Sequence, residues 1–586
     1  MMNMDNRRIS LPLSSAQLGI WFAQKIDPAN TGFSIGEWIE IHGAVDPRLF
    51  EAAIKQTVGD TEASRTRLIE DADVPRQIID PRSEIPLRLL DVSSESDPQA
   101  AAEAWMKTDL ARPVDLLRGP LWTVALFKAA PDRFFLYLRS HHIIMDGFGA
   151  SLFVRRVADV YTALANGLPC PESPFGSLAF LHEDDAAYRA SERFARDRQY
   201  WLERLADRPE PVSLSGRTPA KSGGFMRQTA FLEPGTLDKL RTAARIARAS
   251  LGPVVVAAAA AYTHRLSGAQ DLMLGLPVTG RLKAASRQVP CMAANVLPLR
   301  LTVYPRMRLS ELIQGVVKEI FRALRHQRYR LEDMRGDLGL VAHGRSLFGS
   351  TVNVMAFDDD FRFAGHHTTT HNLANGWPID DLAIYIYDRP DDRGLRIDFN
   401  ANPALYSVEE LGQHQRRFLS LLGDIATDPG QPIGGLELLA RDEREQILVD
   451  WNNTSRPVPD ATLPALFETQ VQRTPEATAL IFEQSALSYG QLNVNANRLA
   501  HFLIGQGIGP ETLVALALPR SPEMIISLLA ILKAGAAYLA LDPDYPAERL
   551  AFMLQDAQPS CVLTKAELAP RLPESVQCLV LDQQDT

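Results

Sequence analysis

HHIIMDG, residues 141–147, separates two segments of different periodicity. The preceding residues 133–141, RFFLYLRSH, are rich in aromatic and aliphatic side chains, which predicts a β-strand. In the following residues 150–164, ASLFVRRVADVYTAL, apolar side chains recur at helical spacing. These side chains are Phe153, Val157, Val160, Tyr161 and Leu164. The stretch therefore predicts a strand, a histidine-rich turn and an amphipathic helix.

The turn carries groups that can move a proton. Histidine titrates near neutrality, so His142 could accept a proton from an attacking nucleophile. Gly147 would permit a tight backbone turn before the helix. Spacing alone favours a different interpretation, a buried structural pair of His141 and His142 beside an Asp146 that caps the helix. Motifs elsewhere in the chain are needed to choose between the catalytic and the structural interpretation.

The composition is that of a globular protein with ample core-forming residues. The chain has 586 residues, of which 46% are hydrophobic and 23% are charged. At about 150 residues per domain, this length predicts about four domains, or fewer and larger ones. Helical and strand-like patterns alternate throughout, which indicates the α/β class.

Charge, cysteines and apolar runs exclude several classes of protein. The net charge of −10 argues against a nucleic-acid or anionic-membrane partner. The four cysteines are scattered and form no CxxC pair, which is typical of a reducing compartment. The N-terminus lacks the apolar core of a signal peptide. The longest apolar run, Leu251–Tyr262, has 12 residues, fewer than the roughly 20 of a membrane helix. We therefore expect a cytoplasmic protein.

Six further motifs accompany HHIIMDG along the chain. They are LSSAQLGIWFAQ (13–24), EASRTRL (62–68), GLPVTGR (275–281), NVLPLR (295–300), RHQRYRLED (325–333) and RSLFGSTVNV (345–354). In this order they resemble the condensation domains of nonribosomal peptide synthetases, whose signature is HHxxxDG. The pattern is most similar to catecholate siderophore synthetases of the enterobactin and bacillibactin type. In EASRTRL, Leu68 stands where Phe is usual, and Arg67 is expected to support the site.

The resemblance implies a fold and a reaction. Two lobes, each like chloramphenicol acetyltransferase, would form a V-shaped pseudo-dimer with a tunnel between them. Carrier proteins would present a donor acyl thioester and an acceptor aminoacyl thioester from opposite ends, and an amide would form. The thiol leaving group, with a pKa near ~8.5, needs little acid help, whereas the attacking ammonium must lose protons.

The resemblance also implies a role for each site residue. His142 would accept or orient the proton of the attacking amine, and His141 would pack against or orient the loop. Asp146 would pair with Arg281 rather than touch substrate. Gly147 would supply the backbone turn, and its amide N–H could lie near the reacting carbonyl.

The C-terminal part resembles a different domain. LSYGQLNVNANRLA (487–500) and LKAGAAYLALDPDYP (532–546) are similar to the first two adenylation-domain motifs, with Ala540 in place of the usual Pro. No Gly/Ser/Thr-rich phosphate loop follows them, so we expect no amino-acid activation by this chain. The predicted boundaries are 1–175 for the N-lobe, 176–440 for the C-lobe, 441–464 for a linker and 465–586 for an incomplete adenylation domain, a partial α/β unit.

Partners and cofactors follow from the same resemblance. No cofactor or metal is expected on the chain itself, because the substrates arrive on the phosphopantetheine arms of carrier proteins. The condensation motifs begin within the first 13 residues, so the donor is expected in trans, on an aryl or acyl carrier protein. We expect a 2,3-dihydroxybenzoyl-like donor and a downstream peptidyl carrier as acceptor.

Four alternatives stay open at this stage. An epimerisation domain shares HHxxxDG but would not normally precede an adenylation domain, and a cyclisation domain has aspartates in place of the histidine pair. A free coenzyme A-dependent acyltransferase would have the same fold, although the C-terminal part argues against it. A non-catalytic carrier-docking scaffold is the alternative from another class, and the intact HHIIMDG argues against it.

Two further clusters invite functional interpretations. HHTTTH (366–371) contains three imidazoles. On a strand, His367 and His371 would share one face and His366 the other, so polar residues are favoured over a metal site. RHQRYR (325–330), preceded by Arg322, could dock an acidic partner, but such runs are usually a solvated face.

Overall fold

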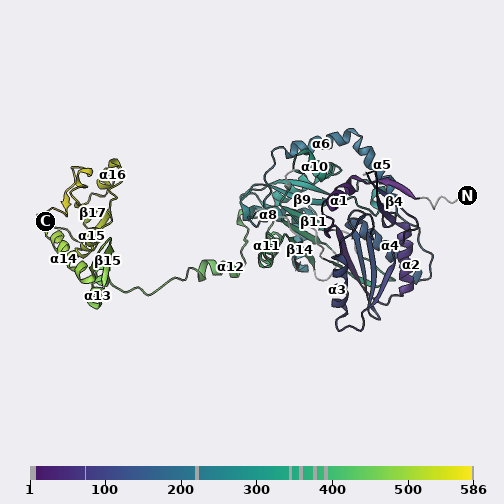
Figure 1. Cartoon of the computed structure of the whole chain (residues 1–586), viewed down its shortest axis with the longest axis horizontal. Helices are drawn as coiled ribbons and strands as arrows, with labels where there is room; N and C mark the ends of the chain where they lie inside the picture. The colour runs from purple at the N-terminus through teal and green to yellow at the C-terminus, as the bar shows by residue number, and fades with distance from the viewer. Residues whose placement is uncertain are drawn as a thin grey trace. The chain divides into compact units, whose positions relative to one another are not determined.

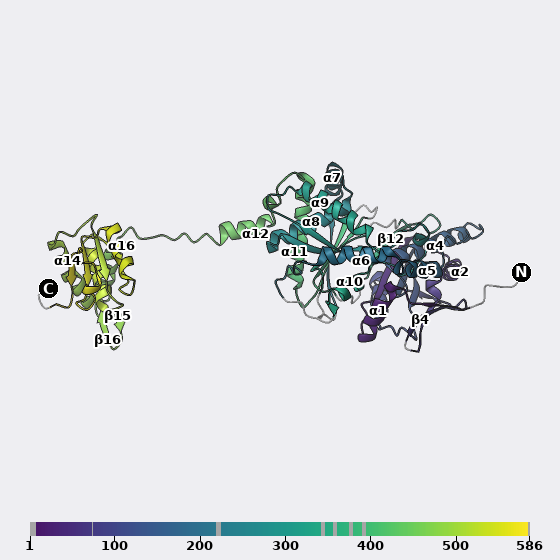
Figure 2. The ribbon, with the colours of Figure 1, turned by 90° about the horizontal axis from the view of Figure 1, so that it is seen from above.

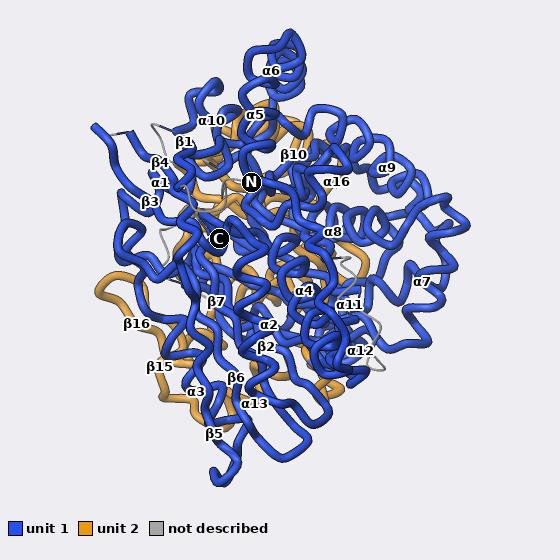
Figure 3. Tube along the Cα trace, turned by 90° about the vertical axis from the view of Figure 1, so that its right-hand side faces the viewer, with its two compact units in different colours: residues 1–450 blue, residues 451–586 orange. Residues whose placement is uncertain are grey.

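The structure is a computed structural model that describes residues 8–583 except 73, 218–223, 342–345, 356–359, 374–378 and 389–393. The chain divides into two compact units, residues 1–450 and 451–586, which are coloured separately in Figure 3. Each unit has its own sheets and core, and the two are described in turn.

The described residues of the first unit form three sheets. The five-stranded sheet has the order β12 (His367–Asn372), β2 (Ser34–His42), β7 (Arg133–His141), β6 (Trp122–Ala130) and β5 (Leu87–Asp91). The six-stranded sheet has the order β10 (Asn295–Thr302), β9 (Asp271–Val278), β11 (Ser350–Met355), β13 (Leu382–Tyr387), β14 (Leu395–Ala401) and β8 (Met226–Leu232). A small sheet joins β1 (Ile9–Pro12), β4 (Val74–Ile79) and β3 (Thr66–Asp71).

Helices alternate with these strands along the chain (Figure 1). Before residue 210 they are α1 (Ser15–Ile26), α2 (Pro47–Asp60), α3 (Pro98–Leu110), α4 (Gly147–Ala165), α5 (Leu178–Arg189) and α6 (Glu192–Leu205). After it they are α7 (Pro234–Ile246), α8 (Leu251–Ser267), α9 (Leu309–Arg325), α10 (Leu331–Asp337), α11 (Val408–Thr427) and the short α12 (Arg441–Glu445).

The five-stranded sheet buries both faces. Successive side chains of a strand point to opposite faces, so Phe134 and Leu136 of β7 join the core formed with α2 and α4. Phe135 and Tyr137 join the opposite core, where α3 contributes Met106. This double burial explains why the centre of the strand, FFLYL (134–138), is continuously apolar rather than alternating.

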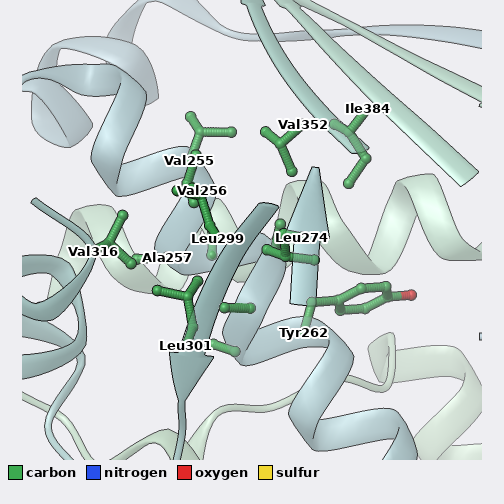
Figure 4. Close-up of a cluster of buried hydrophobic side chains, with 14 of the residues drawn as sticks. Val255, Val256, Ala257, Tyr262, Leu274, Leu299, Leu301, Val316, Val352 and Ile384 are labelled. Atoms are coloured by element: carbon green, nitrogen blue, oxygen red, sulfur yellow. The ribbon is translucent and has the colours of Figure 1, made fainter. Parts of the chain in front are cut away.

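The six-stranded sheet packs against α8, the most apolar helix of the unit. Side chains on every side of α8, including Val255, Val256 and Ala257, are buried, as expected for a helix that is hydrophobic all round. Figure 4 shows them against Leu274 and Leu299 of the sheet. Figure 2 shows α7, α8, α9 and α11 gathered around this sheet.

One strand crosses the predicted lobe boundary. β12, from residues 367–372, pairs antiparallel with β2, so that His371 lies opposite Trp38. The predicted C-lobe, 176–440, therefore contributes an edge strand to the sheet of the N-lobe, and residue 175 does not separate two independent sheets.

The second unit is a small doubly wound domain. A hairpin of β15 (Thr478–Phe482) and β16 (Ser485–Ser488) precedes a parallel sheet of β18 (Ala537–Ala540), β17 (Leu513–Ala517), β19 (Cys561–Thr564) and β20 (Cys578–Val580). The helices are α13 (Leu463–Arg473), α14 (Tyr489–Gly505), α15 (Pro522–Lys533) and α16 (Ala547–Ala557). Leu503 of α14 and Ile531 of α15 belong to one core, and Leu550 of α16 belongs to a second.

Among the described residues, no single helix has the length and apolar character to span a membrane. By length and composition alone, α7 and α8 pass that test together, as a pair bent by 95°.

Candidate functional site

The HHIIMDG turn connects the end of β7 to the start of α4. β7 ends at His141, and α4 begins at Gly147 with Asp146 as its N-cap. The Asp146 carboxylate accepts a hydrogen bond from Gly149 N–H at 2.8 Å, which satisfies one of the free donors of the helix end. Ile143, Ile144 and Met145 are buried in the core beneath the turn. The apolar middle of the motif therefore anchors the turn in the core.

Two glycines lie at the start of α4. Gly147 is its first residue, and the turn role of Gly147 stays a prediction. At Gly149, an added Cβ would lie 2.9 Å from Cys291 N and 2.4 Å from Met145 Sδ. The close approach of α4 to the Cys291 segment is thus what excludes a side chain at Gly149.

His141 is a buried structural histidine. Its Nδ1 accepts a hydrogen bond from Ile143 N–H at 3.2 Å, and its Nε2 lies 3.3 Å from Gln24 Oε1. Nδ1 is therefore the acceptor and Nε2 carries the proton. Burial, with smaller contributions from His142 and Arg139, lowers the pKa of His141 to about 3. His141 is uncharged at neutral pH, and its ring bonds to the loop and to α1.

His142 is the half-buried histidine of the pair. Its backbone N–H donates to Phe33 O at 2.6 Å, at the start of β2. Burial lowers the pKa of His142 to about 4, and the charge of Asp146 and a hydrogen bond with Met145 only partly oppose this shift. Its imidazole is therefore neutral at neutral pH and available as a hydrogen-bond acceptor, but it is a weaker base than a solvated histidine.

Asp146 and Arg281 form a buried bidentate ion pair. Arg281 Nη1 lies 2.7 Å from Asp146 Oδ2, and Nη2 lies 3.1 Å from Oδ1. The two residues are 2% and 3% exposed. Burial alone would raise the pKa of Asp146, but the charge and hydrogen bonds of Arg281 outweigh it and lower that pKa. Asp146 therefore stays ionised and pairs with Arg281, which is the arrangement that the resemblance implies.

The partner segment of Asp146 is a loop that the sequence did not single out. The N–H groups of Ala293 and Ala294 donate to Asp146 Oδ2 at 2.9 and 3.0 Å. The carbonyl oxygens of the same two residues accept from Arg330 at 3.1 and 2.7 Å. Arg330 therefore holds the loop that holds Asp146. The place of Arg330 in RHQRYRLED was the signal available in the sequence.

Cys291 lies in the same loop and has no role as a nucleophile. Its thiol is buried and 3.6 Å from Arg281 Nη2. Burial raises the pKa of Cys291 to about 12, even though the charge of Arg281 acts in the opposite direction. The thiol therefore stays protonated, and only a thiolate is an effective nucleophile.

Arg67 lies apart from these contacts. It is exposed on β3, where its backbone pairs with Ile78 of β4. The half-buried arginine of EASRTRL is Arg65, at the end of the 3-10 turn Ala63–Arg65, and its carbonyl oxygen accepts from Asp80 N–H at 3.0 Å. A supporting role for Arg67 stays a prediction.

The two other clusters have structural surroundings. His371 of HHTTTH stacks on Trp38 with ring centroids 3.8 Å apart, and His367 stacks on His42 at 5.8 Å. Within the described residues, no group of three or more His, Cys, Asp or Glu side chains could hold a metal ion. Arg328 of RHQRYR is engaged by Asp184 at 2.9 Å, so it does not belong to an open basic patch. Arg345, the first residue of RSLFGSTVNV, lies outside the described residues.

A small cavity of about 100 Å³ lies behind the turn. Its lining residues include Ile144, Arg281, Cys291 and His182 of α5. His142 is not among its lining residues. The tunnel that the resemblance places at His142 therefore stays a prediction.

Comparisons with known proteins agree with these features. The model of the Condensation domain family matches residues 8–448, and that of the AMP-binding enzyme family matches residues 467–586. A dimodular nonribosomal peptide synthase from Bacillus subtilis (strain 168) is 48% identical over 581 residues, which are 99% of this chain and 24% of that protein. Enterobactin synthase component F from Escherichia coli (strain K12) is 33% identical over 570 residues, 96% of this chain and 44% of that protein. The chain thus spans less than half the length of these relatives.

Solved structures match the first unit. The starter condensation domain of rhizomide synthetase, in complex with C8-CoA and Leu-SNAC, has a TM-score of 0.69 and 43% identity, covering 74% of this chain and 98% of that one. The first condensation domain of the calcium-dependent antibiotic synthetase, in complex with a substrate analogue, has a TM-score of 0.69 and 34% identity, covering 74% and 99%.

Proposed function

The chain belongs to the condensation-domain family of nonribosomal peptide synthetases, amide-bond-forming acyltransferases, and continues into the start of an AMP-binding domain; from this premise we propose that it joins a carrier-bound aryl donor to a carrier-bound aminoacyl acceptor. The observation that carries the proposal is the HHIIMDG turn, in which a neutral, half-buried His142 lies between two buried, tightly bonded neighbours. Such a turn presents one acceptor nitrogen in a defined direction.

The proposed reaction is an acyl transfer from sulfur to nitrogen. The acceptor amine attacks the thioester carbonyl of the donor, a C–N bond forms and the C–S bond breaks. The nitrogen loses one proton and the departing phosphopantetheine sulfur leaves as a thiol. With a pKa of about 4, His142 is too weak a base to deprotonate a free ammonium with a pKa near ~8. It would instead accept a hydrogen bond from the neutral amine and take the proton from the far more acidic tetrahedral adduct.

Asp146 and Arg281 take no part in this proton transfer. Their ion pair is fully enclosed and joins the turn to the Ala293–Ala294 loop. They position the turn, and the phosphopantetheine arms are supplied by the carriers.

The nature of the donor is the finer part of the proposal. An aryl acid of the 2,3-dihydroxybenzoyl type is supported by the similarity to enterobactin synthase component F. A fatty-acyl donor is the second candidate, because the rhizomide synthetase domain was solved with C8-CoA. A cytoplasmic location belongs to the same proposal, since all four cysteines are free thiols, which is typical of a reducing compartment.

A comparison of donors in separate reactions tests this choice. In each reaction the chain is incubated with one donor and with a peptidyl carrier protein that has been loaded with one proteinogenic amino acid. The donors are 2,3-dihydroxybenzoyl on an aryl carrier, octanoyl-CoA, and an aminoacyl carrier. Intact-protein mass spectrometry of the acceptor carrier should show an aryl-amide product, formed at least about tenfold faster than any octanoyl product.

The other outcomes have definite meanings. Product from octanoyl-CoA alone would assign a lipid starter and overturn the aryl donor. Co-elution of the chain with a carrier, without product from any donor, would favour a docking scaffold over an enzyme.

A further inference from the structure

We propose that Gln17 and Gln24 of α1 are positioning residues that hold the HHIIMDG turn on both sides of His142. The proposal rests on the proposed function, because it assigns a task to side chains that act through His142. Neither residue lies in the turn, and both lie more than 100 positions before it in the chain.

Gln17 and Gln24 lie on the buried face of α1. They are seven residues apart, which places them two turns apart along the same face of the helix. Their exposed fractions are 6% and 3%. Buried polar side-chain atoms almost always have a hydrogen-bond partner. The partners of these two amides therefore indicate the role of each glutamine.

Gln24 fixes the residue before His142. Its Nε2 donates to the carbonyl oxygens of Asp27, Pro28 and Asn30 at 3.0–3.2 Å, which locks the orientation of its amide. The Oε1 atom is thereby turned toward His141 Nε2, 3.3 Å away. The Ile143 N–H sets the Nε2–H tautomer of His141, and Gln24 accepts that proton and fixes the plane of the ring.

Gln17 fixes the residue after His142. Its Nε2 donates to Ile143 O at 2.9 Å, inside the turn. It also exchanges two hydrogen bonds with the buried amide of Gln77, both at 3.1 Å, and its Oε1 accepts from Ser14 N–H at 2.9 Å. Gln17 is thus hydrogen-bonded to the N-terminal end of α1 and to β4 of the small sheet. Its bond to Ile143 O fixes the position of the turn relative to both.

The two contacts together set the direction of the His142 ring. The His141 side chain and the Ile143 carbonyl oxygen are each bonded to α1, and the His142 N–H is bonded to Phe33 O. A misplacement of about 1 Å can cost on the order of 10²-fold in rate. Loss of either glutamine should therefore reduce turnover through His142 and not through substrate binding.

The test compares isosteric substitutions with a matched control. Gln17→Met and Gln24→Met should each lower the single-turnover rate of condensation by about 10–100-fold with KM nearly unchanged. Gln415→Met is the control, because Gln415 is 5% exposed and its amide donates to Gln228 O and Ile397 O at 2.8 and 3.0 Å. It should lose comparable stability toward urea and keep its rate within about twofold. Equal rate losses in all three variants would overturn the proposal.

A double variant tests whether Gln17 acts through His142. In a His142→Ala background, Gln17→Met should lower the remaining rate by less than about threefold, because the ring that it positions is gone. A further loss of tenfold or more in that background would show independent effects and overturn the proposal.

A spectroscopic readout needs no substrate. In chain labelled with ¹⁵N-histidine, the His141 signals, assigned by their loss in His141→Gln, should report the Nε2–H tautomer. Gln24→Met should shift the His141 Nε2–H signals, because that proton loses its acceptor, whereas Gln415→Met should leave them unchanged. Unchanged His141 signals in Gln24→Met would overturn the assignment. If wild-type chain forms no product with any donor, the proposed function fails, while these signals still decide the role of Gln24.

Discussion

Replacing Arg281 with methionine should lower the free energy of unfolding of the first unit by about 3–5 kcal/mol, because it leaves the buried Asp146 carboxylate without its counter-charge. The loss extends beyond the ion pair. Arg281 also donates to Cys291 O at 2.8 Å and Thr279 O at 3.1 Å, and its guanidinium lies over the Phe148 ring at 5.0 Å. Each carbonyl oxygen left buried without a donor adds to the cost.

Urea denaturation followed by tryptophan fluorescence measures this effect. The matched control is Arg198→Met, because Arg198 makes a bidentate ion pair with Asp337 at 2.8 and 2.9 Å but is 50% exposed. Exposed pairs contribute about 0–1 kcal/mol, so the control should unfold close to wild type. Asp146→Ala should destabilise at least as much as Arg281→Met, since it strands a guanidinium and three backbone N–H groups.

The double variant Asp146→Ala/Arg281→Met separates pairing from catalysis. Removing both charges eliminates the uncompensated one, so the double variant should be more stable than the sum of the single losses predicts. Full stability of both single variants with complete loss of turnover would contradict the structural role and indicate direct contact with the reacting atoms.

The local part of the site was predictable from the sequence. RFFLYLRSH and the helical spacing after Gly147 are short-range signals, and β7 and α4 have the predicted places, with Phe153 and Val157 buried. The family match and the solved structures confirm the α/β class and the condensation-domain family. Both were predictable because several motifs in order specify a family better than any single one.

Long-range features were not predictable from the pattern. The backbone partners Ala293 and Ala294 lie 147 and 148 positions from Asp146 in the chain, and neither carries a polar side chain that could have marked it, whereas Arg281 was expected from the family resemblance. β12 pairs with β2 across more than 300 positions, so a lobe boundary drawn from composition could not anticipate it.

The low basicity of His142 was not predictable from the sequence either. An ordinary histidine with a pKa near ~6.5 was the natural expectation. Burial is a tertiary property, and here it lowers that pKa to about 4. The motif identifies the residue, but its surroundings determine how strong a base it is, and this changes the prediction for its variants.

Replacing His142 with alanine should slow condensation by about 10²–10⁴-fold, the usual range for losing a proton-transfer group. The rate should not fall to zero, because two thioesters held together retain the contribution of proximity. Folding should be preserved, since the hydrogen bond that His142 donates to Phe33 O comes from its backbone. Single-turnover mass spectrometry with saturating carriers makes chemistry rate-limiting, and binding of both carriers serves as the control.

The pH dependence distinguishes the lowered pKa from the ordinary one. A group with a pKa of about 4 has lost its proton at every pH above about 5. The wild-type rate should therefore rise only where the acceptor amine loses its proton, near pH ~8, with no inflection near 6.5. An inflection near 6.5 that disappears in His142→Gln would contradict the lowered pKa.

His142→Gln then separates base catalysis from orientation. The glutamine amide can accept a hydrogen bond from the amine, but it cannot hold a proton near neutral pH. If His142 takes the proton from the tetrahedral adduct, His142→Gln should be nearly as slow as His142→Ala. Turnover near the wild-type rate would leave His142 as an orienting acceptor only. The adduct would then have to lose its proton to solvent or to the departing thiolate, which is feasible because a thiol with a pKa near ~8.5 is a stronger base in its ionised form than the buried imidazole.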